Sequence, residues 1–534
     1  MKMKYTLTIV FAGLLLGSDS PVDANEFTAL VVGPPGADLL RGADARKQLV
    51  VTGETADGWA LDVSSSASYE CVPDGVVKID GRGFVTPVAN GEVVVRVAVA
   101  GQGGQPVVAE KKLKVENYVD QPVVNFPNQV VPIFTKHGCN GGGCHGKSGG
   151  QNGFRLSLLG FYPTEDHEYL VKEGRGRRIT PAAPGQSLLL RKALNISPHG
   201  GGKRFGEDSY EYRIIHRWMR QGIPYGNAAD LRVERVEVFP PQRKMPKGSM
   251  QQLSVIAFYN DGSYEDVTPM ATFEVNDKEM GEVDLKGRVQ VYDLSGDVAV
   301  MVRYQGQVGV FRSTVPLGVE VTNLPEPRNF IDTAVFNKLK LLGMPPSEAC
   351  DDQTFIRRVT IDIAGRLPTA EEAEAFAADD TEARRDMAIE RLLESGSYAD
   401  YFTNKWASLL RNKKSKATYE LGTFSFHDWL REMIHTNAPY DQIVRNVVAA
   451  SGDLRSNPGV VWYRSVNKTD QQVEDSAQLF LGMRLQCAKC HHHPFERWSQ
   501  KDYYSYQAFF SLSLIHISEP TRPLYISYAV FCLK

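Results

Sequence analysis

Two groups of cysteine and histidine residues have the types and spacing that could do chemistry in this sequence. Cys487 and Cys490 are three positions apart and His491 follows directly, which is the C-x-x-C-H attachment pattern of c-type haem. Two thiols at this spacing can each add to one vinyl group of the porphyrin, which leaves the adjacent imidazole beside the iron. The pattern predicts covalent haem on Cys487 and Cys490, with His491 as an iron ligand.

The same residues also allow a zinc site. Two thiolates and two imidazoles could satisfy a tetrahedral zinc ion, because His492 and His493 extend the run of histidines. Haem c is the preferred interpretation and zinc is the alternative. The sixth iron ligand could be His493, Met483, His427 or His435, or there could be none, and the sequence does not rank these alternatives.

A looser form of the motif lies upstream, at Cys139, Cys144 and His145. Its two extra residues are glycines, which can loop out and still leave the second cysteine beside its histidine. His199 lies in a Ser-Pro-His-Gly-Gly-Gly stretch and is the best candidate for the distal ligand, because glycine neighbours let a flat cofactor approach closely; an ordinary loop histidine is the alternative. Bis-histidine ligation predicts a low-potential electron carrier.

Signatures of other chemistry are missing. The sequence has no G-x-S-x-G elbow, H-E-x-x-H helix, P-loop or dinucleotide fingerprint. Two pairs of adjacent carboxylates fall at expected helix starts, where capping explains them. No catalytic residue is predicted, and an electron carrier is favoured over a hydrolase. The carboxylates are Asp351, Asp352, Glu371 and Glu372, and two further histidines expected to be structural are His137 and His216.

Both ends of the chain carry segments that are not expected to belong to the folded mature protein. Residues 1–24 combine a basic start, an apolar stretch and a small-residue cleavage site, which predicts a signal peptide and export to the periplasm or cell surface; an uncleaved anchor is the alternative. No transmembrane span is expected in the mature chain. Residues 512–534 resemble a translated sequencing adapter, so they are expected to be an artefact, with natural sequence continuing beyond Ser511; a natural apolar tail that packs as a strand is the alternative.

Composition indicates a multidomain globular protein. The 534 residues are 42% hydrophobic and 23% charged, and the net charge of -3 gives no electrostatic reason to expect nucleic acid as a partner. Cys71 and Cys350 stand outside the two motifs. An exported chain could join them in a disulfide, but unpaired buried thiols are slightly favoured.

An internal repeat organises the first 320 residues. Gln48-Leu49 and Asp62-Val63 recur 204 residues later as Gln252-Leu253 and Asp266-Val267. Both copies alternate apolar and polar residues between Asp-Gly turns, which predicts two antiparallel β-sandwiches. With Asp266-Val267-Thr268, the pattern resembles group 2 bacterial Ig-like domains over 27–116 and 230–320. The resemblance implies spacers or adhesion modules, with contact to a cell surface or polysaccharide.

Helical patterns occupy the remaining parts of the chain. Between the sandwiches, residues 118–226 surround the upstream motif and carry apolar residues at helical spacing near Trp218. Thr369 is expected to cap a helix in the C-terminal half. Further helices are expected there over 329–342, 352–363, 381–393, 398–410, 440–450 and 471–483.

The C-terminal half resembles the larger planctomycete cytochrome c-type domain of unknown function, over residues 328–511. The resemblance rests on the run from Phe355 to Thr369 and on the Cys487 motif with its following His-Pro-Phe-Glu-Arg-Trp sequence. Residues 118–226 are similar to the smaller cytochrome c-like domain, with a longer cysteine spacing and no evident axial methionine. Together these resemblances imply an exported haem protein that transfers electrons to an unidentified redox partner. An extracellular zinc- or iron-binding protein linked to polysaccharide breakdown or adhesion is the alternative.

Overall fold

The computed structural model describes residues 27–36, 38–101, 104–146, 149–227, 230–414, 419–490 and 498–518, the last seven of these as backbone only. The chain divides into two compact units, residues 1–346 and 347–534, each described here by itself. The expected signal peptide at 1–24 and residues 519–534 lie outside the described residues. The first unit is rich in sheet and the second is helical, which confirms the expected change of fold class along the chain.

The first β-rich copy is built from three sheets. A four-stranded sheet has the order β2-β10-β9-β6, with β2 parallel to β10, and two three-stranded sheets have the orders β1-β4-β5 and β3-β8-β7. Inward-facing valines of β9 alternate with outward-facing residues, as expected for a strand with one buried face. The strands are β1 (Phe27–Gly33), β2 (Leu39–Arg41), β3 (Lys47–Gln48), β4 (Val50–Thr55), β5 (Ala60–Asp62), β6 (Ser68–Val72), β7 (Val77–Ile79), β8 (Phe84–Pro87), β9 (Gly91–Ala100) and β10 (Pro106–Glu116).

The second copy repeats this connectivity strand for strand. Its sheets have the orders β12-β20-β19-β16, β11-β14-β15 and β13-β18-β17, and β12 is again parallel to β20. The repeat read from the sequence is therefore a repeat of structure. The strands are β11 (Val233–Phe239), β12 (Gln242–Lys244), β13 (Met250–Gln252), β14 (Ser254–Tyr259), β15 (Tyr264–Asp266), β16 (Thr272–Val275), β17 (Gly281–Val283), β18 (Arg288–Val291), β19 (Gly296–Tyr304) and β20 (Gln307–Val315).

The two copies exchange hydrogen bonds through equivalent residues. The backbone N–H of Gln252 donates to Asp62 Oδ2 at 2.6 Å, and the backbone N–H of Gln48 donates to Asp266 Oδ2 at 2.7 Å. Beside Asp266, burial lowers the pKa of Lys47 to about 8, against the pull of that carboxylate. Because each copy supplies one aspartate and one backbone donor, the interface has approximate two-fold character.

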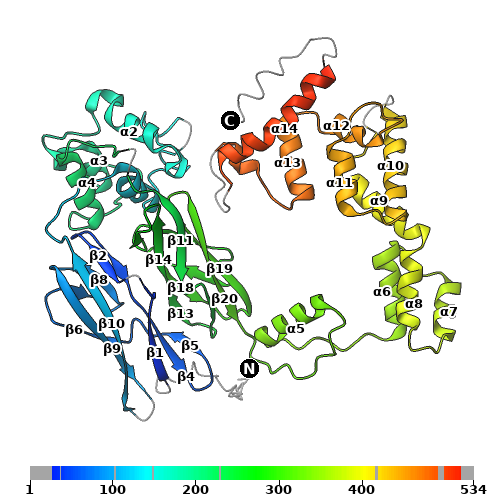
Figure 1. The fold of residues 1–534 in the computed structure, drawn as a ribbon, viewed down its shortest axis with the longest axis horizontal. Helices are drawn as coiled ribbons and strands as arrows, with labels where there is room; N and C mark the ends of the chain where they lie inside the picture. The colour runs from blue at the N-terminus through cyan, green and yellow to red at the C-terminus, as the bar shows by residue number, and fades with distance from the viewer. Residues whose placement is uncertain are drawn as a thin grey trace, which may run out of the picture. The chain divides into compact units, whose positions relative to one another are not determined.

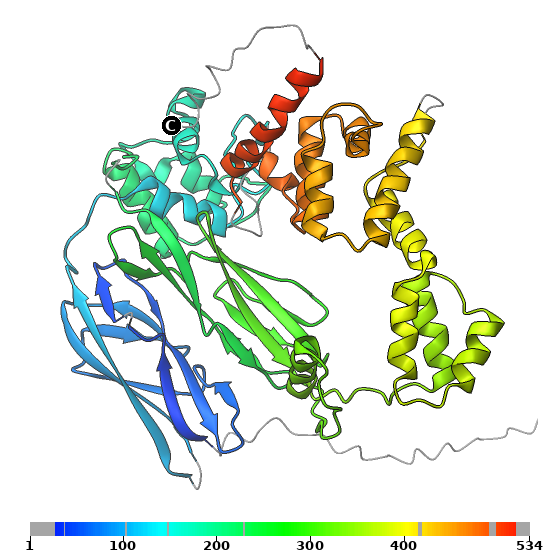
Figure 2. The same cartoon turned by 45° about the vertical axis from the view of Figure 1, so that its right-hand side comes forward.

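Helices between the two copies complete the first unit and lie beyond one end of the strands in both views (Figures 1 and 2). Their core centres on Trp218 and Phe126, which are fully buried and 5.3 Å apart between ring centroids. An ion pair of 2.5 Å joins Arg217 to Asp44 of the first copy, and Lys136 Nζ donates to the carbonyl oxygen of Ala271 in the second. These helices are α1 (Val131–Lys136), α2 (Pro163–Val171), α3 (Leu188–Ala193) and α4 (Tyr210–Arg220), with α5 (Phe330–Leu342) closing the unit.

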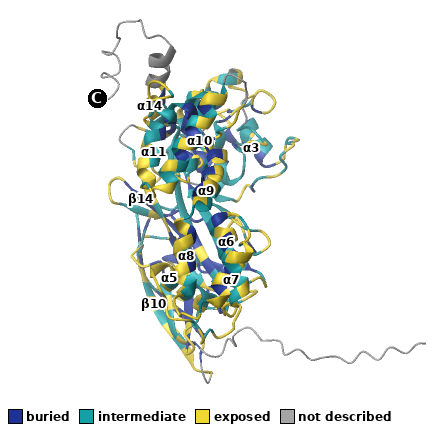
Figure 3. Ribbon diagram, turned by 90° about the vertical axis from the view of Figure 1, so that its right-hand side faces the viewer, coloured by how far each residue is buried: buried dark blue, intermediate teal, exposed yellow. Residues whose placement is uncertain are grey.

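Helix ends in the second unit carry the capping signals that the sequence predicted. Thr369 and Glu372 form a capping box at the start of α7, and Gly365 ends α6 in the left-handed conformation. Buried residues lie along α9 and α10 (Figure 3). The helices are α6 (Asp352–Ala364), α7 (Ala370–Ala378), α8 (Arg384–Leu393), α9 (Gly396–Leu409), α10 (Glu420–His435), α11 (Tyr440–Val448), α12 (Val461–Ser465), α13 (Thr469–Phe480) and α14 (Gln500–Ser518).

Three further expectations can be compared with the fold. Cys71 and Cys350 are free thiols as favoured, but both are half-buried rather than buried. Among the described residues, no helix combines the length and the apolar character needed to cross a membrane. Helix α14 extends through residues 512–518, the first part of the segment expected to be an artefact.

Candidate functional site around the cysteine motifs

The upstream motif forms a closed loop directly after α1. The backbone N–H of Cys139 donates to the carbonyl oxygen of Phe134 at 2.8 Å, which closes the end of the helix after the left-handed Gly138. The N–H of His145 then returns to the carbonyl oxygen of Cys139 at 3.0 Å. A Cβ at Gly143 would meet no atom within 4 Å, so this part of the loop bulges into open space. Gly143 therefore faces open space, whereas a Cβ at Gly141 would lie 3.2 Å from the carbonyl oxygen of Gly138, and the backbone of His145 returns to Cys139.

His145 is held by its own backbone surroundings. Its Nδ1 lies 2.9 Å from the carbonyl oxygen of Phe154, and the two rings are 4.5 Å apart between centroids. Because a carbonyl oxygen only accepts, Nδ1 carries the proton and Nε2 keeps its lone pair. Burial is the main cause that lowers the pKa of His145, with His199 also lowering it. The neutral imidazole, which is the form that binds metals, is therefore favoured.

His199 has the same arrangement on the opposite loop. It follows α3, and its Nδ1 lies 3.0 Å from the carbonyl oxygen of Gly202, whose N–H returns to the carbonyl oxygen of His199 at 2.8 Å. This closed turn again leaves Nε2 as the free ring nitrogen. A Cβ on Gly201 would lie 2.9 Å from His199 Cε1 and 2.6 Å from Arg204 Nη2, and that Nη2 atom is 3.9 Å from Cys144 Sγ, so Arg204 links the turn of His199 to the motif.

The thiols of the upstream motif differ in solvation from free cysteine. Burial raises the pKa of Cys139 to about 11, while Arg204 acts to lower it and Cys144 to raise it. The Nη2 atom of Arg204 lies 3.9 Å from Cys144 Sγ. One thiol of the motif is thus in contact with a guanidinium group.

Neighbouring side chains fix the two segments that carry this site. The backbone N–H of Leu156 donates to the carbonyl oxygen of His145 at 2.8 Å, and the next residue, Ser157, donates its hydroxyl to Asp166 Oδ2 at 2.7 Å. Burial raises the pKa of Asp166 to about 6. Asp166 of α2 and Arg204 were not predicted, because single charged residues form no recognisable sequence pattern.

The two histidines expected to be structural make contacts of that kind. His137 pairs with Glu211 at 3.2 Å and so joins the end of α1 to the start of α4. His216 stacks on Tyr212 with ring centroids 5.5 Å apart. Neither interaction involves the cysteine motif.

The downstream motif has a more open setting. Cys487 and Cys490 are exposed thiols on a 3₁₀ turn, Gln486–Lys489, and the N–H of Cys490 donates to the carbonyl oxygen of Cys487 at 3.3 Å. The turn is anchored by Ala488, which is fully buried, and by an ion pair of 2.8 Å between Lys489 and Asp470 of α13. The predicted ligands His491 and His493 lie outside the described residues.

Other candidates for the sixth ligand have ordinary positions in the second unit. His427 is on α10, with Nε2 3.4 Å from Asn404 of α9, and His435 is the last residue of α10. Met483 follows α13, and its backbone N–H donates to the carbonyl oxygen of Ala477. Nothing in these contacts marks one of them as an iron ligand.

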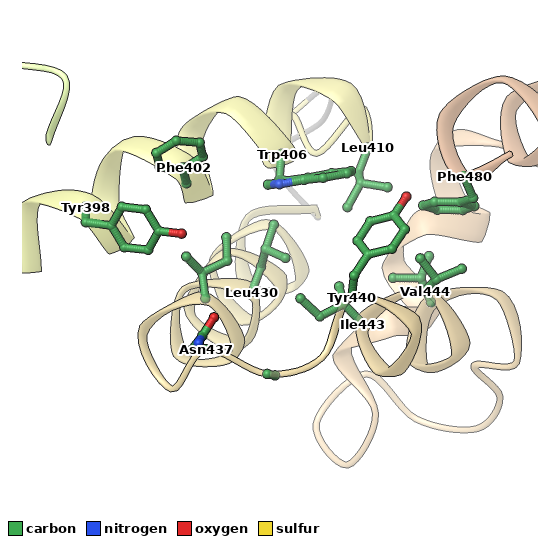
Figure 4. A pocket seen from close by; sticks show the side chains of 13 residues that line it. Tyr398, Phe402, Trp406, Leu410, Leu430, Asn437, Tyr440, Ile443, Val444 and Phe480 are labelled. Carbon is green, nitrogen blue, oxygen red and sulfur yellow. The ribbon is translucent and has the colours of Figure 1, made fainter. Parts of the chain in front are cut away.

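A small apolar pocket in the second unit does not fit a haem-sized ligand. Its volume is about 120 Å³, whereas ligand pockets measure ~300–1,000 Å³. Trp406 and Tyr440 face one another across it with ring centroids 5.8 Å apart, and Leu430 and Phe480 are among the other lining residues (Figure 4). This pocket is a gap in helix packing rather than a cofactor site.

The upstream motif supplies the types of donor that covalent haem attachment needs. Across the described residues, no group of three or more His, Cys, Asp or Glu side chains is gathered closely enough to hold a metal ion. The donor set has instead two thiols, a neighbouring imidazole and a second imidazole on another loop, which matches covalent attachment and axial ligation. A Cβ at Gly201 would lie 2.9 Å from His199 Cε1, so the glycine lets this turn stay closely folded.

Comparison with known proteins finds a family model that matches part of the chain. Residues 330–513, about a third of the chain, match the PSCyt2 family model, described as a protein of unknown function (DUF1549). This agrees with the resemblance of the C-terminal half to the larger planctomycete cytochrome-type domain. No curated protein matches the chain.

Similarity to solved structures is weak. The S-layer protein rSbsC(31–844) is 10% identical with a TM-score of 0.15 over 56% of this chain and 29% of that one. Domains 5–6 of the S-layer protein SbsC are 10% identical, with a TM-score of 0.21 over 54% of this chain and 99% of that one. Mouse cadherin-23 EC22–24 is 14% identical, with a TM-score of 0.13 over 54% of this chain and 98% of that one. Scores this low carry no argument about function.

Proposed function

We propose that this chain is an exported c-type haem protein that transfers electrons. Cys139 and Cys144 are the attachment residues at the upstream site, and Cys487 and Cys490 are those at the downstream site. The matched iron ligands are His145 upstream and His491 downstream. The redox partner is another protein.

The observation that carries the proposal is the paired orientation of His145 and His199. Each directs Nδ1 to a backbone carbonyl oxygen, at 2.9 and 3.0 Å, and keeps Nε2 for a ligand. A hydrogen bond on the other ring nitrogen is the usual way in which a protein fixes the tautomer and orientation of a ligating histidine. Two histidines with this arrangement beside two thiols favour bis-histidine ligation of a covalently held porphyrin.

The chain's own residues have distinct roles in this proposal. Cys139 and Cys144 hold the porphyrin through thioether bonds, and His145 and His199 orient their imidazoles toward the iron. Haem, when bound, supplies reversible one-electron oxidation and reduction. Two imidazole ligands favour a lower potential than an imidazole and a thioether. His493 is the proposed second ligand at the downstream motif.

The β-rich copies serve as spacers or as attachment surfaces in this proposal. Their equivalent aspartates, Asp62 and Asp266, bind the partner copy rather than an open site, which suits a structural role. Their likeness to group 2 bacterial Ig-like domains adds to that assignment. Export to the periplasm or cell surface agrees with haem attachment, which takes place outside the bacterial cytoplasm.

Peroxidase staining of haem on a denaturing gel tests the proposal. The wild-type chain, produced in a host that attaches c-type haem, is expected to keep its stain, because thioether bonds survive denaturation. Cys139→Ala combined with Cys487→Ala should abolish the stain, whereas Cys71→Ala combined with Cys350→Ala should leave it unchanged. An unstained wild-type protein containing stoichiometric zinc would show that the zinc alternative is correct.

A further inference from the structure

We propose that Arg204 binds a propionate carboxylate of the porphyrin at the upstream motif and so sets the orientation in which the cofactor enters. The inference deepens the proposed function and rests on it. Arg204 is a positioning residue here, distinct from the attachment cysteines and the axial histidines.

The position of the guanidinium group carries the first step. Its Nη2 atom lies 3.9 Å from Cys144 Sγ. A Cβ built on Gly201 would lie 2.6 Å from the same Nη2 atom and 2.9 Å from His199 Cε1. Arg204 therefore lies between the attachment thiol and the turn that carries the distal histidine, where the edge of a porphyrin held by both would lie.

The second step is the missing acceptor of Arg204. Its Nε atom is buried and has no hydrogen-bond partner among the described residues. Within the same part of the chain, no carboxylate forms an ion pair with it, and the sulfur of Cys144 is only a weak acceptor. A buried guanidinium N–H without an acceptor costs free energy, so this site favours a ligand that supplies one.

Three other arginines of the same helical segment have oxygen acceptors. Arg155 pairs with Glu173, and Arg217 pairs with Asp44, although Nε and Nη2 of Arg217 have no partner among the described residues. Arg178 donates to two backbone carbonyl oxygens. Arg204 differs from them, because its contact at the motif is a thiol that the proposed chemistry converts to a thioether. That leaves its planar donors for a carboxylate, which they match in geometry.

Gly201 explains how this arrangement is possible. Any side chain at this position would collide with the guanidinium group and with the ring of His199. The turn therefore keeps Arg204 and His199 on the same side of the loop. A propionate bound by Arg204 would place the porphyrin face beside His199.

A titration with two porphyrins tests the inference. The full mature chain is produced without attached haem and carries His491→Ala, so that absorbance reports the upstream motif. Ferric protoporphyrin IX and its dimethyl ester, which has no free carboxylate, are each titrated into this chain. The comparison is repeated with Arg204→Ala, with Arg204→Lys and with Arg155→Ala as the matched control.

The expected result is a selective loss. Arg204→Ala should weaken binding of the free acid about tenfold or more. A hydrogen bond to a charged group contributes enough free energy to change an affinity by about that factor. Binding of the dimethyl ester should change by less than about twofold, Arg204→Lys should keep part of the preference, and Arg155→Ala should keep all of it.

Two results would overturn the inference while leaving the proposed function intact. In one, Arg204→Ala weakens both porphyrins equally, which indicates a purely structural role. In the other, the wild-type chain binds acid and ester alike and Arg204→Ala changes neither. Failure of the wild-type chain to bind either porphyrin would instead contradict the proposed upstream haem site itself.

Discussion

Cys139 and Cys487 begin motifs of similar chemistry in different surroundings. Cys139 is half-buried on a loop closed by backbone hydrogen bonds, with His145 and His199 oriented beside it. Cys487 is exposed on a 3₁₀ turn at the surface of the second unit. The irregularly spaced motif is thus held by contacts within its own loop, whereas the described part of the regular motif is an exposed turn.

The largest expected effect comes from destabilising one of the two units without the other. Trp218 and Trp462 are both fully buried, in the first and the second unit respectively. Replacing either with alanine should lower the free energy of unfolding of its own unit by ~3–5 kcal/mol, because a large cavity is left. Urea unfolding followed by intrinsic fluorescence measures this loss.

The haem content of these variants tests whether each motif depends only on the fold of its own unit. Trp218→Ala should reduce haem on the upstream peptide and leave the downstream peptide unchanged, and Trp462→Ala should do the reverse. If either substitution reduces haem at both motifs equally, the two sites do not have independent scaffolds.

Thiol reactivity is the next expected difference. With its pKa raised from 9.0 to about 11, Cys139 should be alkylated at pH 8 roughly a hundred times more slowly in the folded chain without haem than in the unfolded chain. Cys487 and Cys490 are exposed and should be slowed far less. Mass spectrometry after timed iodoacetamide treatment measures each rate. Equal protection of all three thiols would contradict the contrast in burial.

Lowering the pH should change the stability of the two units in opposite directions, through one aspartate near each motif. Burial raises the pKa of Asp166 to about 6 from 3.8, so the folded state binds more protons than the unfolded state between these values. The Asp166 contribution to stability therefore falls as pH rises from about 4 to 6, by ~1–3 kcal/mol. Asp166→Asn should remove this pH dependence from the unfolding of the first unit.

Asp470, beside the downstream motif, provides the control of opposite sign. Its hydrogen bond with Lys489 lowers its pKa, so its contribution is present at neutral pH and is lost as pH falls through the lowered value. Asp470→Asn should alter stability at neutral pH more than at strongly acidic pH. An unchanged Asp166 profile together with a steep Asp470 effect near pH 5 would contradict both assignments.

Much of the fold was readable because local and global signals agree. The Gln48–Gln252 repeat predicted two similar β-rich copies, and Thr369 and Glu372 predicted a capped helix. The hydrogen bonds that Asp62 and Asp266 exchange between copies were not predictable, because a repeat carries no information about how its copies pack. Helix α10, Glu420–His435, was also missed, since Gly422 and its aromatic neighbours weaken the local helical signal.

The candidate site was readable only in part. Motif spacing predicted Cys139, Cys144 and His145, and the glycine-rich context selected His199, which the structure places nearby. Arg204 was not predictable, because its significance lies in a missing acceptor, and only three-dimensional contacts show that. His491 and His493 lie outside the described residues, so their roles stay predictions.

The most direct test of the account is the mass of the proteolytic peptide that contains Cys139 and Cys144. The mature protein should be isolated from a host that attaches c-type haem, digested and analysed under denaturing conditions. The account predicts that this peptide carries one covalently bound haem, with both thiols consumed. A peptide of unmodified mass, with two free thiols or a disulfide, would contradict the proposed upstream haem site.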